Sequence, residues 1–322
     1  MKALTFSKFG GAQVMEYGDV PDLLLNADEV LIKMKAIGLN YADIYRRKGN
    51  YHLIGNPPYI AGYEGAGVVA KTTSPLFKVG DRVSFADVPF SNAEYVSASV
   101  EHVIPLPDDI SFNTASSVLL QGLTAQYLAA DSYQVKSGDV VLVHAASGGV
   151  GQILSQICKL RGATVIGLTR DRGKIADILE AKADHALILE KGWQERVMEI
   201  SQSKGVDVVY DSVGSTLMDS FSVTKVRGTI VFYGMSGADP EPVDPRMLMD
   251  TSKTLTGGDL WSYLTSKEQR LKRSKEIFDW LIQGVVKLKT PTEFKLSEGQ
   301  AAHRFLEEGK SAGKVLLIPD EK

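Results

Sequence analysis

The sequence has little cysteine, almost no net charge and no long apolar run. Its 322 residues include a single cysteine, Cys158, so the chain can form neither an internal disulfide nor a Cys-rich zinc site. Lysine and arginine number 36 against 39 aspartate and glutamate, a net charge of −3 that gives no electrostatic ground for nucleic-acid binding. No run of 18 apolar residues and no signal-peptide core is present. We therefore expect a soluble, cytoplasmic protein without a membrane or nucleic-acid partner.

Two patterns of secondary structure follow one another along the chain. The first third has short apolar segments separated by Gly and Pro, which is typical of a β-rich fold with tight turns, and its clearest strand is expected at 30–37. From about residue 109, strands alternate with helices, which indicates a parallel sheet covered on both faces. The expected helices are 113–130, 150–161, 174–183 and 193–203, and the expected strands are 140–144, 164–168, 206–210 and 228–233.

The end of the chain again carries helix and strand signals. Ser266 with Gln269, and Ser297 with Gln300, form capping-box patterns that predict the starts of two helices. A last strand is expected at 315–318. The periodicity leaves open whether this tail returns to the first part of the chain or forms a lobe of its own.

A glycine-rich turn joins the expected strand 140–144 to the expected helix 150–161. The dinucleotide fingerprint Gly-x-Gly-x-x-Gly needs this order, and its three positions hold Ala146, Gly148 and Gly151. Gly148 would let the backbone approach a pyrophosphate, and Gly151 would let helix and strand pack closely. The helix N-terminus offers N–H groups to the phosphates. The alternative is a tight turn without a ligand. The predicted cofactor-binding residues here are Ala146, Ser147, Gly148, Gly149, Val150 and Gly151.

The end of the next expected strand distinguishes the two nicotinamide cofactors. A site that prefers NAD places an acidic residue there to bind the ribose 2′-OH. Here the strand ends at Thr169, with Arg170 and Lys174 beside it, which favours the 2′-phosphate of NADPH. A shift of one residue in the strand end would instead favour Asp171, and an exposed basic loop without a ligand is a further alternative. We predict NADPH as the cofactor, bound by Thr169, Arg170 and Lys174.

Taken together, the motifs resemble those of the quinone oxidoreductase (zeta-crystallin) branch of the medium-chain dehydrogenases/reductases. Besides the glycine turn, the similar segments are, in chain order, Gly-Leu-Asn-Tyr-Ala-Asp at 38–43, Gly-Tyr-Glu-Gly-Ala-Gly at 62–67, Gly-Asp-Arg-Val at 80–83, Gly-Leu-Thr at 122–124, Asp-Ser-Val-Gly at 211–214 and Gly-Lys-Val at 313–315. The resemblance covers essentially the whole chain. The order of the motifs is more specific than any one of them.

The resemblance implies an α/β protein with two domains. Residues 1–120 would form a GroES-like, β-rich catalytic domain, completed by the C-terminal return of residues 264–322. Residues 121–263 would form a Rossmann domain, a doubly wound parallel sheet that binds NADPH. A homodimer is also implied, with edge strands near residues 255–260 as candidates for the interface.

The motifs that hold zinc in related alcohol dehydrogenases lack metal ligands here. Those enzymes carry a Cys in the first N-terminal motif and a His before the Glu of the second. The corresponding positions of this chain hold Leu39 or Asn40 and Tyr63, and its five histidines show no ligand spacing. We therefore expect no metal site, and reduction of an electrophile instead of zinc-assisted alcohol oxidation.

The catalytic residues are expected by resemblance around the nicotinamide, at Asn40, Tyr45 and Tyr51. A tyrosine hydroxyl can donate a hydrogen bond or a proton to a substrate oxygen, although a packed aromatic with an exposed hydroxyl is the alternative for both tyrosines. Lys314 is interpreted more readily as a solvated lysine than as a cofactor contact. Further cofactor contacts are expected at Thr124, Val213, Gly234, Met235 and Ser236.

These observations predict a metal-free, NADPH-dependent reductase that transfers hydride to a quinone, with a small-molecule electrophile as its partner. Reduction of an enal or enone, an activated alkene, is the alternative activity. A third interpretation is an NADPH-binding protein with a structural or RNA-binding role. The charge of −3 disfavours the RNA-binding version.

Overall fold

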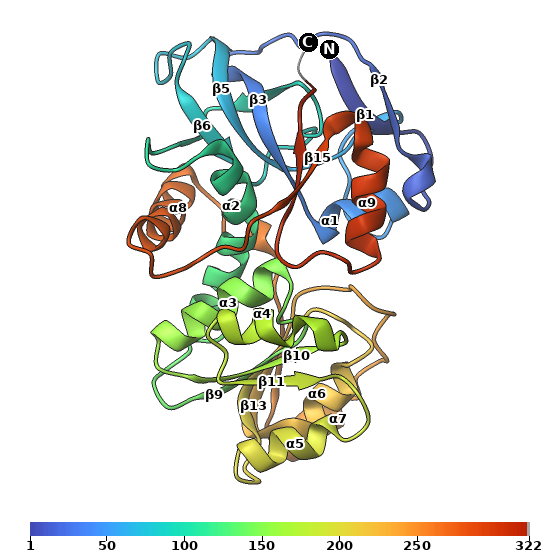
Figure 1. The fold of residues 1–322 in the computed structure, drawn as a ribbon, viewed down its shortest axis with the longest axis vertical. Helices are drawn as coiled ribbons and strands as arrows, with labels where there is room; N and C mark the ends of the chain where they lie inside the picture. Colours follow the sequence, from blue (N-terminus) through green and yellow to red (C-terminus); the bar gives the residue numbers. More distant parts are fainter. Residues whose placement is uncertain (321–322) are drawn as a thin grey trace. The chain divides into compact units, whose positions relative to one another are not determined.

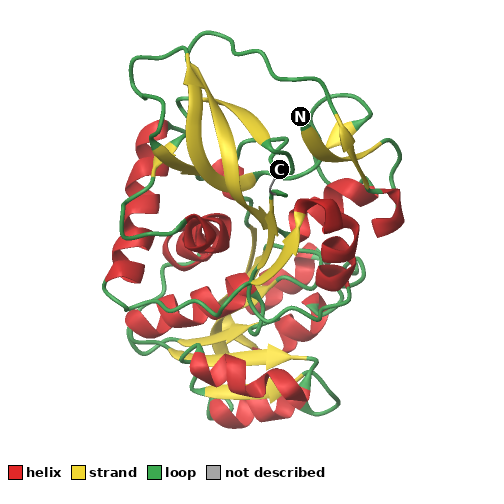
Figure 2. Cartoon of the chain, turned by 45° about the horizontal axis from the view of Figure 1, so that its top comes forward, coloured by secondary structure: helices red, strands yellow, loops and turns green. Residues whose placement is uncertain are grey.

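The computed structural model describes residues 1–320, and the chain divides into two compact units (Figures 1 and 2). One unit comprises Met1–Leu120 together with the segment from Leu264 onward, and the other comprises Gln121–Tyr263. Each unit has its own apolar core, built on its own sheet.

The first unit contains a seven-stranded sheet and a small three-stranded sheet. The larger sheet has the order β15-β16-β3-β5-β6-β8, with β7 also paired to β3, and the smaller has the order β2-β1-β4. Along β3 (Glu29–Leu39) the residues Val30, Ile32 and Met34 are buried on one face, as expected for a half-buried strand. The other strands are β1 (Lys2–Phe6), β2 (Glu16–Asp19), β4 (Tyr59–Ile60), β5 (Glu64–Thr72), β6 (Arg82–Phe85), β7 (Tyr95–Ser99) and β8 (Ile104–Pro105).

The C-terminal segment completes the first unit. Its last strand, β16 (Val315–Ile318), pairs antiparallel with β3, and β15 (Thr292–Lys295) extends the sheet beyond it. The tail therefore returns to the first part of the chain, which decides between the two alternatives that the periodicity leaves open. The helices of this unit are α1 (Tyr41–Lys48), α8 (Lys267–Ile282) and α9 (Gly299–Glu307).

The second unit is built on a six-stranded, wholly parallel sheet with the order β11-β10-β9-β12-β13-β14. Numbered from β9, this is the Rossmann order 3-2-1-4-5-6, in which ligands bind where the order reverses, at the carboxyl ends of the first and fourth strands. Helices α3 and α4 lie on one face of the sheet, and α5, α6 and α7 on the other (Figure 1). The strands are β9 (Val140–Val143), β10 (Thr164–Thr169), β11 (His185–Ile188), β12 (Val206–Asp211), β13 (Thr224–Phe232) and β14 (Thr254–Gly257). The helices are α3 (Gly149–Leu160), α4 (Ile175–Glu180), α5 (Trp193–Ile200), α6 (Leu217–Val223) and α7 (Pro245–Thr251).

Helix α2 (Phe112–Tyr127) leads from the first unit into the second, and a π-helical turn over Leu128–Ser132 follows it. The predicted helix 113–130 thus corresponds to α2 and most of this π-helical turn.

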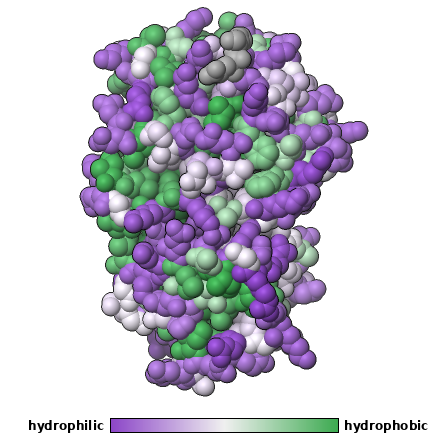
Figure 3. All heavy atoms as spheres, in the orientation of Figure 1, coloured by the Kyte–Doolittle hydropathy of each residue, from purple (hydrophilic) through white to green (hydrophobic). Residues whose placement is uncertain are grey.

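On the face drawn in Figure 3, hydrophilic residues predominate and hydrophobic ones form smaller groups among them. Within residues 1–320, the helices lack the combination of length and hydropathy that a membrane crossing needs.

The predicted fold class is confirmed, but two local predictions are wrong. Ser297 does not cap a helix, because its backbone N–H and hydroxyl both donate to the Asp320 carboxylate, and α9 begins two residues later, at Gly299. The helix expected at 174–183 is shorter, because a 3₁₀ turn at Arg172–Lys174 precedes α4, which ends at Glu180.

Candidate active site

The glycine turn after β9 presents backbone N–H groups at the start of a long helix. Ala145 has a positive φ of 48°, which turns the chain sharply after the strand. Gly148 is extended, with φ −76° and ψ 168°, and α3 begins at the next residue. The N-cap residue is Gly148, which has no side chain to cap this N-terminus. The N–H groups of its first turn are therefore available to an anion, and the helix dipole favours one there.

Gly151 is required by close packing between α3 and the turn. A Cβ at this position would lie 2.6 Å from the Ala145 carbonyl oxygen and 2.7 Å from Ala146 Cα, both of which are backbone atoms. A Cβ at Gly148 would meet only the Ala145 oxygen, at 3.2 Å. Gly151 thus lets helix and strand approach each other, as predicted from the fingerprint.

The substitution of alanine for the first glycine of the fingerprint is accommodated by a glycine on the neighbouring strand. Ala146 is fully buried. A Cβ at Gly167, on β10, would lie 2.8 Å from the Ala146 methyl carbon. The methyl group therefore lies where a side chain at position 167 would be, and the geometry of the turn is kept.

The end of β10 is neutral. The strand ends at Thr169, whose hydroxyl lies 3.4 Å from the Ser147 hydroxyl and accepts a hydrogen bond from the Asp171 backbone N–H at 3.2 Å. Asp171 lies two residues beyond the strand end, where its Oδ1 accepts from the Gly173 N–H and caps the 3₁₀ turn. Thr169 and not Asp171 is therefore the residue at the strand end.

The cations beyond this strand end differ in their partners. Arg172 forms an ion pair with Glu190 at 2.6 Å. Arg170 is exposed, and Lys174 is partly exposed. Arg170 is therefore better placed than Arg172 to bind a phosphate.

A buried polar network fixes the loops after β12. Asp211 accepts hydrogen bonds from the Val213 and Gly214 N–H groups and from the Thr216 and Ser220 hydroxyls. Burial alone would raise the pKa of Asp211, but the nearby His144 and these hydrogen bonds outweigh burial and lower it. The predicted contact Val213 is thus held at the carboxyl end of its strand.

The imidazole of His144, directly before the glycine turn, belongs to the same network. Ser220 gives its one hydroxyl proton to Asp211, so at 3.0 Å the His144 Nε2 must be the donor to the Ser220 oxygen. Burial lowers the pKa of His144, which keeps the ring neutral. Neutral His144 therefore connects the ends of β9 and β12.

The other predicted contacts of this unit lie near strand ends or on a helix. Ser236 donates its backbone N–H and its hydroxyl to the Ser212 carbonyl, which ties the loop after β13 to the loop after β12. Gly234, Met235 and Ser236 are all partly exposed. Thr124 lies on α2 and is buried.

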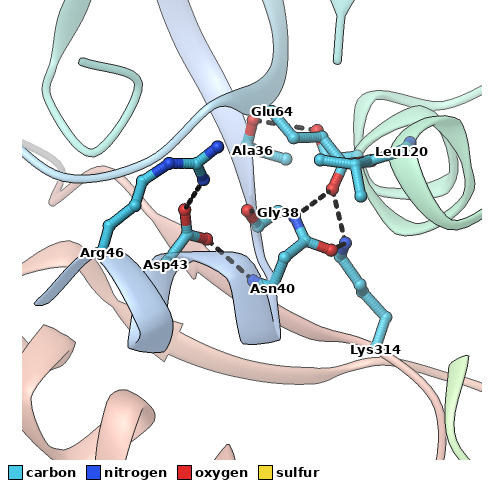
Figure 4. Close-up of polar contacts among 9 residues, drawn as sticks. Ala36, Gly38, Asn40, Asp43, Arg46, Glu64, Leu120 and Lys314 are labelled. Carbon is cyan, nitrogen blue, oxygen red and sulfur yellow. Dashed lines mark hydrogen bonds and ion pairs between the residues drawn. The ribbon is translucent and has the colours of Figure 1, made fainter. Parts of the chain in front are cut away.

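In the first unit, Asn40 lies in a buried, charged network (Figure 4). Lys314 Nζ donates to Asn40 Oδ1 at 2.8 Å and to Glu64 Oε2 at 2.5 Å. Asn40 Nδ2 donates to the same Glu64 oxygen at 2.8 Å, and the other Glu64 oxygen accepts the Leu120 N–H at 2.7 Å. Lys314 is only 3% exposed, so its interpretation as a solvated lysine is wrong. Its charge is balanced by Glu64, as a buried charge requires.

The same asparagine begins α1 and connects to a second ion pair. The Asn40 N–H donates to Asp43 Oδ2 at 2.9 Å in a capping box, and Arg46 Nη1 lies 3.3 Å from Asp43 Oδ1 (Figure 4). Both charged side chains are buried. Burial raises the pKa of Asp43, and Arg46 and the Asn40 N–H act in the opposite direction.

The predicted catalytic tyrosines are neighbours in the structure. Tyr45 lies on α1, and Tyr51 lies in the loop after it. Their ring centroids are 6.3 Å apart in an edge-to-face arrangement, and both side chains are partly exposed. The two rings therefore lie together in the first unit, and both are partly accessible to solvent.

Metal-ligating side chains are scattered in the described part of the chain. Residues 1–320 contain no group of three or more His, Cys, Asp or Glu side chains that could hold a metal ion. Cys158 is fully buried on α3, and burial raises its pKa to about 12, so it carries no thiolate near neutral pH.

The buried positions of Lys314, Glu64 and Arg46 are not evident from the sequence. Glu64 and Lys314 stand inside segments that match the family, which was the available signal, but nothing in the sequence pairs two residues 250 positions apart. Arg46 is followed by Arg47 and Lys48, and this run of cations matches none of the motifs on which the site was predicted. In the structure, Arg46 and Arg47 are both buried.

The fold and these sites define a two-domain oxidoreductase with a GroES-like unit and a Rossmann unit, and comparison with known proteins agrees. Residues 26–139 match the alcohol dehydrogenase GroES-like domain, and residues 149–273 match the zinc-binding dehydrogenase family. Over 99% of both chains, the protein is 33% identical to a quinone oxidoreductase of Pseudomonas aeruginosa. It is also 33% identical to a 2-haloacrylate reductase of Burkholderia, over 98% of both chains. The crystal structure of Escherichia coli quinone oxidoreductase complexed with NADPH is similar, with a TM-score of 0.94 and 33% identity over 99% of this chain and 100% of that one. The chain therefore belongs to the quinone oxidoreductase family of the medium-chain dehydrogenases/reductases.

Proposed function

We propose that this oxidoreductase uses NADPH to reduce a quinone and that it needs no metal. The observation that carries the proposal is the uncapped N-terminus of α3 beside a neutral strand end with Arg170 next to it. This set of groups suits a dinucleotide with a 2′-phosphate. Support for a quinone comes from the full-length similarity to quinone oxidoreductases.

The residues of the second unit fit the cofactor. The first-turn N–H groups of α3 would bind the diphosphate, and Gly148 leaves room for it because only one backbone atom lies within 4 Å of a Cβ there. Thr169, Arg170 and Lys174 would hold the ribose phosphate. Thr124 and the strand-end residues Val213, Gly234, Met235 and Ser236 would border the rest of the cofactor.

The residues of the first unit supply orientation and protons. When bound, a reduced nicotinamide supplies the hydride. The Tyr45 and Tyr51 hydroxyls would hydrogen-bond to the quinone oxygen and orient the ring, and one of them would donate a proton to the reduced oxygen. Asn40 has its amide engaged by Lys314 and Glu64, so its contribution is to hold the start of α1, from which Tyr45 projects.

Reduction of an activated alkene is the second candidate. It is favoured by the similarity to a 2-haloacrylate reductase, which matches at the same identity as the quinone oxidoreductase from Pseudomonas. The same hydroxyl groups would then protonate the carbon next to the one that receives hydride. An RNA-binding role has weaker support, because the net charge is −3. A structural role without catalysis is the remaining alternative.

The test is NADPH oxidation by the purified protein, followed by absorbance at saturating cofactor. The panel comprises 1,4-benzoquinone, 9,10-phenanthrenequinone, an enone and 2-chloroacrylate, each also assayed with NADH. We expect turnover of quinones with NADPH. Turnover of the enone or 2-chloroacrylate alone would select the alkene reductase. Tight NADPH binding without any turnover would reject both activities.

We also propose a cytoplasmic homodimer. Strand β14 is an edge of the parallel sheet, so its outer N–H and C=O groups have no neighbouring strand in this sheet. A second copy could pair along this edge and extend the sheet. Light scattering on the purified protein would give the mass that decides between monomer and dimer.

A further inference from the structure

Arg46 is a buried arginine that contacts the Tyr51 ring, the backbone after Tyr51 and the Tyr63 ring. It lies on α1 and is only 2% exposed. Its guanidinium carbon is 3.6 Å from the centroid of the Tyr63 ring and 5.0 Å from that of the Tyr51 ring. Burial of an arginine is costly unless its charge and donors are satisfied. Here the charge is balanced by Asp43 and the π faces of two tyrosines.

The same side chain also fixes the backbone beside Tyr51. Arg46 Nε donates to the His52 carbonyl oxygen at 3.1 Å. The His52 ring in turn lies against Tyr51, with the centroids 3.9 Å apart. Arg46 therefore contacts both the Tyr51 ring and the backbone of the next residue, His52.

We propose that Arg46 is a positioning residue that sets the orientation of the Tyr51 hydroxyl toward the substrate. The proposal rests on the function proposed above, in which Tyr51 contacts the substrate oxygen. Asp43 contributes to this positioning, because its ion pair with Arg46 holds the guanidinium near the first turn of α1. The capping box, in which the Asn40 N–H donates to Asp43, fixes the position of Asp43 in turn.

The requirement for an arginine follows from the geometry. A flat guanidinium can lie over a ring and still donate in its own plane to Asp43 and to the His52 carbonyl. A lysine would keep the positive charge, but its single ammonium cannot reproduce these contacts together. Because a displacement of about 1 Å can reduce a rate by 10²-fold, a small shift of the Tyr51 loop would be visible in kinetics.

The experiment compares Arg46→Met, Arg46→Lys and Tyr51→Phe, alone and as the pair Arg46→Met with Tyr51→Phe. We expect Arg46→Met to lower kcat for quinone reduction by about 10- to 100-fold, with KM for NADPH changed by less than about threefold. Arg46→Lys should recover part of the rate. If Arg46 acts through the Tyr51 hydroxyl, the double variant should be no slower than Tyr51→Phe.

A matched control is provided by Arg47, the next residue on the same helix, which is also buried but pairs with Glu307. Arg47→Met should lower the free energy of unfolding and leave the kcat of the folded protein near that of the wild type. Multiplicative losses in the Arg46 and Tyr51 double variant, or a wild-type kcat in folded Arg46→Met, would overturn the proposal.

A second readout works without catalysis. In protein labelled with ¹³C-tyrosine, the Tyr51 signal is assigned by its loss in Tyr51→Phe, and Arg46→Met should shift it in the protein alone. If no substrate is turned over by the wild type and this shift is present, the proposed function has failed while the positioning contact stands. An unchanged Tyr51 signal would contradict the contact itself.

Discussion

The charged residues after β10 fall into two groups. Some bond to other residues of the protein and stabilise the loop, and others are exposed. Asp171 caps the 3₁₀ turn, and Arg172 pairs with Glu190. Arg170 is exposed beside the neutral strand end, with Lys174 closing the turn. We therefore predict that Arg170 and Lys174 set the preference between NADPH and NADH, and Arg172, two residues from Arg170, serves as the control.

Replacing Arg170 and Lys174 together by alanine should weaken NADPH binding and leave NADH binding nearly unchanged. A hydrogen bond to a charged group contributes about 1.5–3 kcal/mol, so the loss should be at least about tenfold in Kd. The cofactor affinities are measured by titration of protein fluorescence. Arg172→Ala should change neither affinity by more than about twofold. Equal losses for both cofactors in the double variant would contradict the phosphate assignment.

At this scale the sequence predicts backbone geometry better than side-chain partners. The glycine turn was predictable, because Gly151 is required by packing against residues close to it in the chain, and the six-residue fingerprint includes that glycine. Lys314 was not, because the partners of its ammonium, Asn40 and Glu64, are 274 and 250 residues away in the chain. The identity of one residue as lysine does not show whether its side chain is solvated or is buried beside a carboxylate.

Among the elements, α1 and α9 are joined by a buried cluster around His303. Arg47 is fully buried and donates to Glu307 on α9 at 2.5 Å, and its Nη1 lies 3.3 Å from His303 Nδ1. Burial, together with the charge of Arg47, lowers the pKa of His303 to about 3. The folded protein therefore keeps this imidazole neutral, while the unfolded chain protonates it below an ordinary pKa of about 6.5.

This difference makes the stability of the protein dependent on pH in a defined window. Because the pKa of His303 is lowered on folding, the unfolded state binds the additional proton, and the free energy of unfolding falls as the pH falls below about 6.5. Between pH 7 and pH 5 the loss from this residue should be about 2 kcal/mol. His303→Gln keeps an acceptor for Arg47 and removes the titration, so its loss over this interval should be smaller by that amount.

The measurement is urea unfolding of both proteins at pH 7 and pH 5. His144, whose pKa is also lowered, is present in both and cancels in the comparison. The pKa of Glu307 lies below its usual range, so its titration falls outside this interval. An identical loss of stability in wild type and His303→Gln would show that another group causes it.

Elements were predicted where the local pattern and the tertiary contacts agree. Ser266 caps α8 as expected, because its hydroxyl accepts the Gln269 N–H and no other group competes for it in the described chain. Ser297 has the same local pattern, but its hydroxyl donates to Asp320 instead. The capping pattern could not show this, because the competing carboxylate comes from beyond the last strand.

For the whole molecule, the decisive feature is that the C-terminal tail belongs to the first unit. Periodicity predicted the tail's helices and strand but not their destination. The motif order predicted it, and β16 pairs with β3 as the resemblance implied. The buried pair of Lys314 with Glu64 lies beside this junction, since Lys314 directly precedes β16 and Glu64 begins β5.

Lys314→Met should therefore lower the free energy of unfolding by about 3–5 kcal/mol, because it leaves Glu64 buried without its counter-charge. Adding Glu64→Gln removes the orphaned charge and keeps an acceptor for the Leu120 N–H, so the double variant should regain most of the loss. Lys310→Met, which removes an exposed pair with Glu308, should cost less than about 1 kcal/mol. Urea unfolding of the four proteins gives these values. If the double variant is no more stable than Lys314→Met, the uncompensated charge of Glu64 is not the cause of the loss.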